Sequence, residues 1–301
     1  MGVTPSLAWA GSPTWLRRLG WASLGANVGI VLTGGAVRLT GSGLGCPTWP
    51  RCTGRSFTPH GALSYHSAIE FGNRMLTFVL TAVAVATLVA AWRSGRRELR
   101  RLGIVLALGV PAQAVIGGIT VLTDLNPWIV SFHLLVSLAM VSTAVLFLWR
   151  LDRPPGVGST GGVTTLAWAT YALAWVVLYL GTIVTGSGPH AGDLDSPRNG
   201  LNPAQLSQLH ADAVFLFVGL TIGLLVALRV GVGTPAQVRA VTVLLVVELA
   251  QGLIGFVQYA TDLPVLLVEL HLLGAATISA AVTWALIEVR EDVTAQESVP
   301  V

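Results

Sequence analysis

The chain contains no lysine and few charged residues of any kind. Charged residues make up 10% of its 301 residues and hydrophobic residues 53%, and the mean hydropathy is +0.73. A soluble globular chain carries about a quarter charged residues, so this composition indicates a membrane protein and leaves no stretch for a separate soluble domain. The net charge of +3 comes from arginines scattered between apolar runs, an arrangement that argues against nucleic-acid binding.

Eight apolar runs are long enough to cross a bilayer, whose core of about 30 Å needs roughly 20 helical residues. They lie at about 20–38, 67–91, 102–122, 128–149, 165–185, 206–229, 238–259 and 265–288. Arginines precede the first run as in a signal peptide, but that run is long and lacks a convincing cleavage site, so we interpret it as a retained helix. The sequence therefore predicts an all-α membrane protein with eight transmembrane helices.

The arginines also predict the orientation of these helices. With the N-terminus in the cytoplasm, twelve arginines lie in cytoplasmic segments and four in outer loops. This bias follows the positive-inside rule and predicts a multi-pass protein of the cell (inner) membrane with both termini in the cytoplasm. The two longest loops, about 39–65 and 186–205, then face outward, and residues 291–301 form a cytoplasmic tail.

Only two cysteines are present, Cys46 and Cys52, and both lie in the first outer loop. An oxidising outer compartment favours a disulfide between them. Two interpretations of the pair are open: a structural staple that closes a short loop, or a redox-active dithiol.

The two halves of the chain repeat each other. Residues 113–133 align without a gap with residues 251–271 at an offset of 138, and the second and sixth runs align at an offset of 137. The matched positions include Gln113 with Gln251, Gly117 with Gly255, His133 with His271, Asn73 with His210, and Thr-Gly-Ser-Gly at 40–43 with the same letters at 185–188. Four helices per repeat keep both copies in one orientation. The sequence thus predicts two pseudo-symmetric four-helix bundles, 15–150 and 165–290, related by an axis along the membrane normal.

Three histidines lie within the apolar runs at similar depth near the outer surface: His133, His210 and His271. A single histidine in a membrane helix commonly just bonds to a neighbouring helix, but three at equivalent repeat positions favour a shared ligand role. Histidine is an axial ligand of haem iron, and two facing helices of a bundle supply one each. His210 and His271 form such a pair. His133 is instead paired with Asn73, so the N-terminal half is expected to hold a haem by one axial bond or to present an open iron face.

Glu70 is a carboxylate inside a predicted membrane helix, where charge is costly and indicates function. Asn73 and Arg74 share its helical face, and its repeat counterpart is Ser207, so the acid is specific to one half. Two interpretations are open: a Glu70–Arg74 pair that only neutralises itself, or a group that accepts a proton or stabilises positive charge beside a bound haem.

The other polar residues near the outer surface have simpler interpretations. His66 lies one turn before the acid and is a candidate substitute ligand, whereas His60 and His190 are expected to be solvated loop residues. Asp124 and Asp262, in tight outer turns, are expected to form those turns or to cap helices.

The sequence resembles the haem A synthases over about residues 15–290. The resemblance rests on GGAVRLTGSGLGCPTWPRC at 34–52, IEFGNR at 69–74, the duplication of four helices and the three membrane histidines. It implies an enzyme that oxidises the C8 methyl group of haem O to a formyl group, with water as the oxygen source, and so supplies haem A for cytochrome c oxidase.

The resemblance also implies where haem binds. A resident haem b is expected in the C-terminal bundle at His210 and His271, and the substrate haem in the N-terminal bundle, both toward the extracytoplasmic side. The implied substrate-site residues are His133, Asn73 and Arg74, with Glu70 as the catalytic group.

One position departs from the family pattern. The second helix usually contains Glu-x-x-His-Arg, and Asn73 replaces that histidine, which leaves the second ligand of the substrate haem undefined. Besides haem O and lipid, the resemblance offers a haem O synthase and an electron acceptor as candidate partners, and homo-oligomer formation stays open.

Two other functions fit a duplicated histidine-containing bundle. One is a non-enzymatic b-type dihaem membrane cytochrome for electron transfer, which needs two bis-histidine haems and is disfavoured by Asn73. The other is a transporter or porphyrin carrier, which is disfavoured because none of the apolar runs reads as a broken helix.

Overall fold

The computed structural model describes residues 11–59, 64–153, 160–231 and 233–291. These residues form eight long helices: α1 (Pro13–Leu39), α2 (Tyr65–Arg93), α3 (Arg97–Leu122), α4 (Pro127–Asp152), α5 (Gly162–Ser187), α6 (Pro203–Val230), α7 (Pro235–Ala260) and α8 (Val265–Arg290). Each is long and apolar enough to cross a membrane, which confirms the predicted all-helical chain with eight candidate spans. His60 and the tail 292–301 lie outside the described residues.

The helices extend a few residues beyond the apolar runs, and polar side chains cap the starts of several of them. Ser64 accepts a hydrogen bond from Ser67 N at the start of α2, and Asn202 accepts bonds from the first turn of α6. Thr234 and Gln237 form a reciprocal capping box at the start of α7. Such caps satisfy backbone N–H groups that the helix itself leaves without partners.

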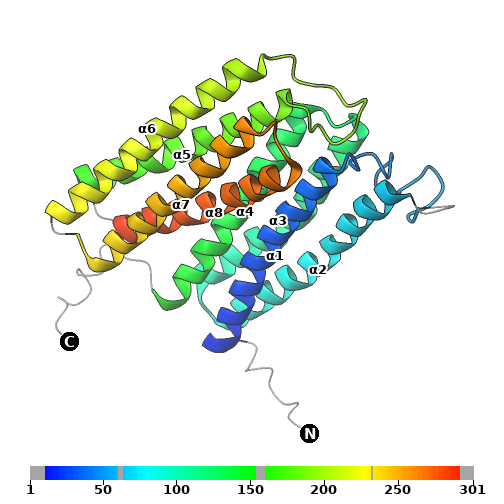
Figure 1. Cartoon of the computed structure of the whole chain (residues 1–301). Coiled ribbons are helices and arrows are strands. Elements are labelled where there is room, and N and C mark those ends of the chain that lie inside the picture. Colours follow the sequence, from blue (N-terminus) through cyan, green and yellow to red (C-terminus); the bar gives the residue numbers. More distant parts are fainter. Residues whose placement is uncertain (1–10, 60–63, 154–159, 232, 292–301) are drawn as a thin grey trace, which may run out of the picture.

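The helices contact one another in two closed rings. In the first ring α1 contacts α2, α2 contacts α3, α3 contacts α4 and α4 contacts α1, and helices α5 to α8 follow the same order. Helices α2 and α4 therefore lie diagonally across the first ring, and α6 and α8 across the second. Helix α8 also contacts α1 and α4, and α4 contacts α5, so the rings share a packed seam (Figure 1).

One end of the molecule contains both long loops, 40–59 and 188–202, and the two tight turns between α3 and α4 and between α7 and α8. We call it the loop end; α1 begins and α8 ends at the opposite end (Figure 1). The two turns adopt the same left-handed backbone, with φ of 52° and 59° at Asp124 and Leu125 and of 60° and 58° at Asp262 and Leu263. Both aspartates are thus turn residues, and the caps of α4 and α8 are Asn126 and Pro264.

Candidate functional site

Glu70 and Arg74 form an ion pair one turn apart near the loop end of α2. Arg74 Nη2 lies 2.5 Å from Glu70 Oε1, and Arg74 Nε donates to the same oxygen at 3.1 Å. Glu70 is only 4% exposed. The ion pair considered in one of the two interpretations of Glu70 is therefore present, but the pair also has other partners.

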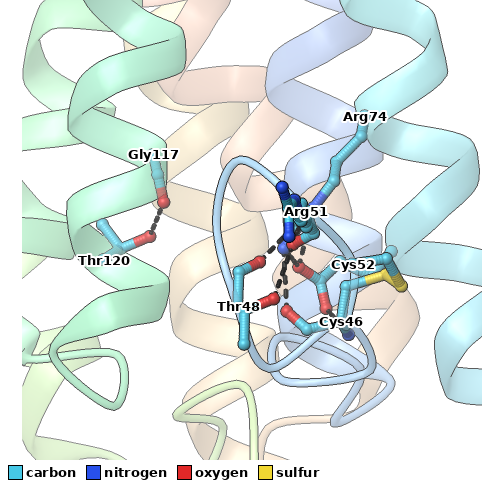
Figure 2. A network of polar contacts seen from close by, with 8 residues as sticks. Cys46, Thr48, Arg51, Cys52, Arg74, Gly117 and Thr120 are labelled. Atoms are coloured by element: carbon cyan, nitrogen blue, oxygen red, sulfur yellow. Dashed lines mark hydrogen bonds and ion pairs between the residues drawn. A yellow bond between two sulfur atoms is a disulfide. The ribbon is translucent and has the colours of Figure 1, made fainter. Parts of the chain in front are cut away.

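Both residues bind the backbone of the loop 40–59. Arg74 donates from Nη2 to the Cys46 carbonyl at 2.8 Å and from Nη1 to the carbonyls of Thr48 and Arg51 at 3.0 and 3.3 Å. The Cys46 N–H donates to Glu70 Oε2 at 2.5 Å. Figure 2 shows the Arg74 side chain extending from α2 into the loop. Arg74 thus uses its planar fork of donors to fix three loop carbonyls at once.

A disulfide joins Cys46 to Cys52 across this loop, with the Cα atoms 4.4 Å apart. The predicted disulfide is therefore present. Both cysteines are buried, at 0% and 1% exposure, and Figure 2 shows the bond beside the carbonyls that Arg74 holds.

The loop also reaches α3 through Trp49. A Cβ atom at Gly118 would collide with the Trp49 indole, so the ring packs directly on the α3 backbone. The preceding residue, Gly117, faces the His133 ring, to which a Cβ would come within 3.3 Å at Cε1. The loop therefore packs on the α3 residue that follows the glycine facing the predicted substrate-site histidine.

Each of the three predicted ligand histidines lies against a glycine of a neighbouring helix. A Cβ at Gly181 would lie 3.2 Å from His210 Cε1, and one at Gly255 would lie 2.9 Å from His271 Cε1. We call these glycines, together with Gly117, the ring seats. All three histidines lie six or seven residues into their helices at the loop end.

The histidine side chains fit a haem-iron ligand set. In each of His133, His210 and His271 the Nδ1 atom is buried and has no hydrogen-bond partner. Buried imidazole nitrogens without partners are costly, whereas paired imidazoles on facing helices are a standard haem-iron ligand set. Among the described residues, no group of three or more His, Cys, Asp or Glu side chains is arranged to hold a bare metal ion.

Two of these histidines each have a backbone carbonyl bound by a glutamine of the neighbouring helix. Gln113 Nε2 donates to the His133 carbonyl at 3.1 Å, and Gln251 Nε2 donates to the His271 carbonyl at 2.7 Å. Each glutamine lies one turn before a ring seat on the same helix. The sequence matched these glutamines and glycines by their offset, but their contacts with the histidines cross between helices and were not predicted.

The structure places Asn73 and His66 apart from each other. Thr33 Oγ1 on α1 donates to Asn73 Oδ1 at 2.7 Å. His66 is exposed, and its Nδ1 lies 3.0 Å from Ser42 Oγ in the loop. His66 therefore lies at the loop, about two turns along α2 from Asn73.

His190 is not the solvated loop residue that was expected. Its Nε2 lies 3.0 Å from the Leu263 carbonyl, and its own carbonyl accepts a 2.6 Å bond from Arg38 Nε. Arg38 Nη2 also donates to the Thr185 carbonyl at 2.6 Å. Arg38 thereby ties the end of α1 to the loop of the second ring, a role that its place in the sequence did not indicate.

A second buried acid, Glu248, lies in the middle of α7. It is 3% exposed and accepts a 2.7 Å bond from Thr221 Oγ1 on α6, while its Oε2 has no partner. The sequence predicted no role for this residue, and it lies in the ring that does not contain Glu70.

Comparison with known proteins gives one family. The family model described as cytochrome oxidase assembly protein, COX15-CtaA, matches residues 17–192.

Individual relatives extend the similarity along the chain. A protein named heme A synthase from Lysinibacillus sphaericus (strain C3-41) is 33% identical over 180 residues, which cover 56% of this chain and 58% of the relative. One of the same name from Bacillus pumilus (strain SAFR-032) is 30% identical over 66% of this chain and 71% of the relative. A third, from Bacillus cereus (strain 03BB102), is 24% identical over 89% and 92%.

Proposed function

The chain belongs to the COX15-CtaA family of cytochrome oxidase assembly proteins, and on this premise we propose that it is a haem A synthase, a membrane oxidoreductase that converts haem O to haem A. The observation that carries the proposal is the set of three histidines seated on glycines at the loop end of both rings. The family favours this enzyme over the electron-transfer cytochrome and the porphyrin carrier.

His210 and His271 would hold a resident haem b in the second ring. These residues come from the diagonal helices α6 and α8, and each has an unpartnered buried nitrogen and a ring seat. When bound, this haem supplies one-electron transfer. The protein positions it through Gly181, Gly255 and the bond from Gln251 to the His271 backbone.

The first ring holds haem O, the substrate, with His133 as its axial ligand. His133 on α4 lies diagonally across the ring from Asn73 and Arg74 on α2. Trp49 and the disulfide-closed loop cover the loop end beside Gly117 and Gly118, where they shield the porphyrin edge from lipid.

Glu70 is the catalytic group of the first ring. Conversion of the C8 methyl group to a formyl group takes up one water, passes four electrons to an external electron acceptor and releases four protons, and positive charge develops at the porphyrin edge on the way. A buried carboxylate near the loop end stabilises that charge and accepts a proton for transfer to outer water. Arg74 keeps this carboxylate in place and couples it to the loop.

We further infer that the two rings are parallel copies and that both haem sites lie toward the extracytoplasmic side. The matching left-handed turns and the two glutamine bonds to histidine carbonyls support the duplication. The excess of arginine at the end opposite the loop end supports cytoplasmic termini.

Haem analysis of purified protein tests the proposal. Membrane protein produced with a haem O supply should contain haem B together with haem O or haem A by pyridine haemochrome and chromatography. His271→Ala should lose haem B, whereas His133→Ala should lose haem O and haem A and keep haem B. Haem B alone in the native protein, with no conversion of added haem O, would refute the enzyme.

A further inference from the structure

Asn73 occupies the position where the second ring has the ligand His210. Its side-chain oxygen is held by the Thr33 hydroxyl at 2.7 Å. The side chains that serve as haem axial ligands are histidine, cysteine, methionine and tyrosine. Asn73 is thus both a poor iron ligand and a residue already bound to the neighbouring helix α1.

Helix α1, next to Asn73, also differs from its counterpart α5 in the second ring. Gly181 on α5 gives the His210 ring its room, since a Cβ there would lie 3.2 Å from Cε1. Alignment of Thr-Gly-Ser-Gly at 40–43 with 185–188 places Ala36 at the position of Gly181. The second ring thus has His210 beside the glycine Gly181. At the matching positions the first ring has Asn73 and Ala36, whose methyl group fills the space that the glycine leaves open.

Other ligand side chains near this position are already engaged. His66 bonds to Ser42 at the loop, about 10 Å along α2 from Asn73. Cys46 and Cys52 are joined to each other.

We propose that the substrate haem in the first ring has a single protein axial ligand, His133, and that its iron face toward Asn73 is an open binding site for a small sixth ligand such as water, carbon monoxide or imidazole. This inference rests on the proposed function. A haem held by one axial bond exchanges more easily than one held by two, which suits a substrate that must enter and leave, whereas His210 and His271 suit a haem that stays.

Carbon monoxide binding tests the inference on the purified full-length protein supplied with haem O. In the reduced native protein, carbon monoxide should bind in proportion to the haem O content, and the oxidised protein should give a high-spin signal by electron paramagnetic resonance. The bis-histidine haem b should contribute to neither signal. Asn73→His should abolish both signals, while Asn73→Ala should leave both unchanged.

A paired variant covers the case in which the new histidine does not fit. Asn73→His combined with Ala36→Gly reproduces the histidine and ring seat of the second ring, so its haem O should become low-spin and lose carbon monoxide binding. Low-spin haem O without carbon monoxide binding in the native protein would overturn the inference. If His66→Ala then restored carbon monoxide binding, His66 would be the missing ligand.

The substrate site and the open iron face can be refuted separately. If the native protein takes up no haem O, or takes it up equally well with His133→Ala, the proposed substrate site is wrong. If haem O binds through His133 but is six-coordinate through a protein side chain, only the open-face inference is wrong.

Discussion

The backbone N–H of Cys46 donates to Oε2 of Glu70 at 2.5 Å, and this bond joins the disulfide-closed loop to the buried acid on α2. Because Arg74 binds the other carboxylate oxygen and three loop carbonyls, the acid, the arginine and the loop form one hydrogen-bonded unit. A change in any of the three is expected to affect the others, so variants must be chosen to separate charge from geometry.

Glu70→Gln removes the charge and keeps the shape. The amide oxygen of glutamine can still accept the Cys46 N–H, but the amide nitrogen cannot accept from Arg74, which loses its ion-pair partner. The bonds from Arg74 to the three loop carbonyls should keep the loop in place, and the side chain no longer accepts a proton. We expect haem A formation to fall roughly 100-fold or more, the range of a lost general base. Haem B content and its absorption spectrum should be unchanged. Haem chromatography measures the first and reduced-minus-oxidised spectra the second; undiminished haem A output would contradict the catalytic role.

Arg74→Lys tests the loop attachment. Lysine keeps the positive charge, but its ammonium cannot reproduce the planar fork that reaches Cys46, Thr48 and Arg51 together. A charged hydrogen bond contributes about 1.5–3 kcal/mol, so the loop should open more often and exchange its amide hydrogens faster over residues 44–56. Arg51→Lys is the matched control because the Arg51 side chain interacts within its own loop, with the Gly54 carbonyl and the Phe57 ring. Equal exchange in both variants would remove the clamp role from Arg74.

The paired change Cys46→Ser with Cys52→Ser separates the staple from the redox dithiol. A bond closing so short a loop stabilises by about 2 kcal/mol in the chain-entropy model. If the disulfide is a staple, its loss should lower the thermal stability of the loop region, but haem A formation should stay measurable at reduced temperature. A redox dithiol requires that haem A formation stop at every temperature. Activity of the double variant across a temperature series distinguishes the two.

The sequence predicted the eight helices well because a membrane span requires a long apolar run, a signal that needs no knowledge of neighbours. The helix ends moved outward by a few residues because caps such as Ser64 and Thr234 lie beyond the apolar core. The disulfide was also predictable, since the chain has only two cysteines.

The contacts across helices were not predictable in the same way. Gly117 and Gly255 were visible as repeat positions, but their role depends on which histidine side chain lies opposite each of them. The packing of α3 on α4 and of α7 on α8 decides that. Arg38 and His190 are 152 residues apart in sequence, and the bond between them follows from the arrangement of the two loops. Sequence patterns indicate which residue faces the interior of a helix pair, but not which backbone atom it meets.

The ring seats make a prediction that compares three glycines. A Cβ at Gly255 would lie 2.9 Å from the His271 ring and one at Gly117 would lie 3.3 Å from the His133 ring, whereas Gly252, on the same helix as Gly255, has nothing within 4 Å. Overpacking costs about 1–3 kcal/mol, which corresponds to roughly a 5- to 150-fold loss in haem affinity. Gly255→Ala should therefore lose haem B from the second ring, and Gly117→Ala should weaken haem O binding by a smaller factor and spare haem B. Gly252→Ala should change neither.

Haem-to-protein ratios by pyridine haemochrome measure all three variants, with the thermal stability of each variant as the folding control. Loss of haem B from Gly252→Ala as well would show that helix α7 tolerates no added methyl group and that the ring seat has no special role.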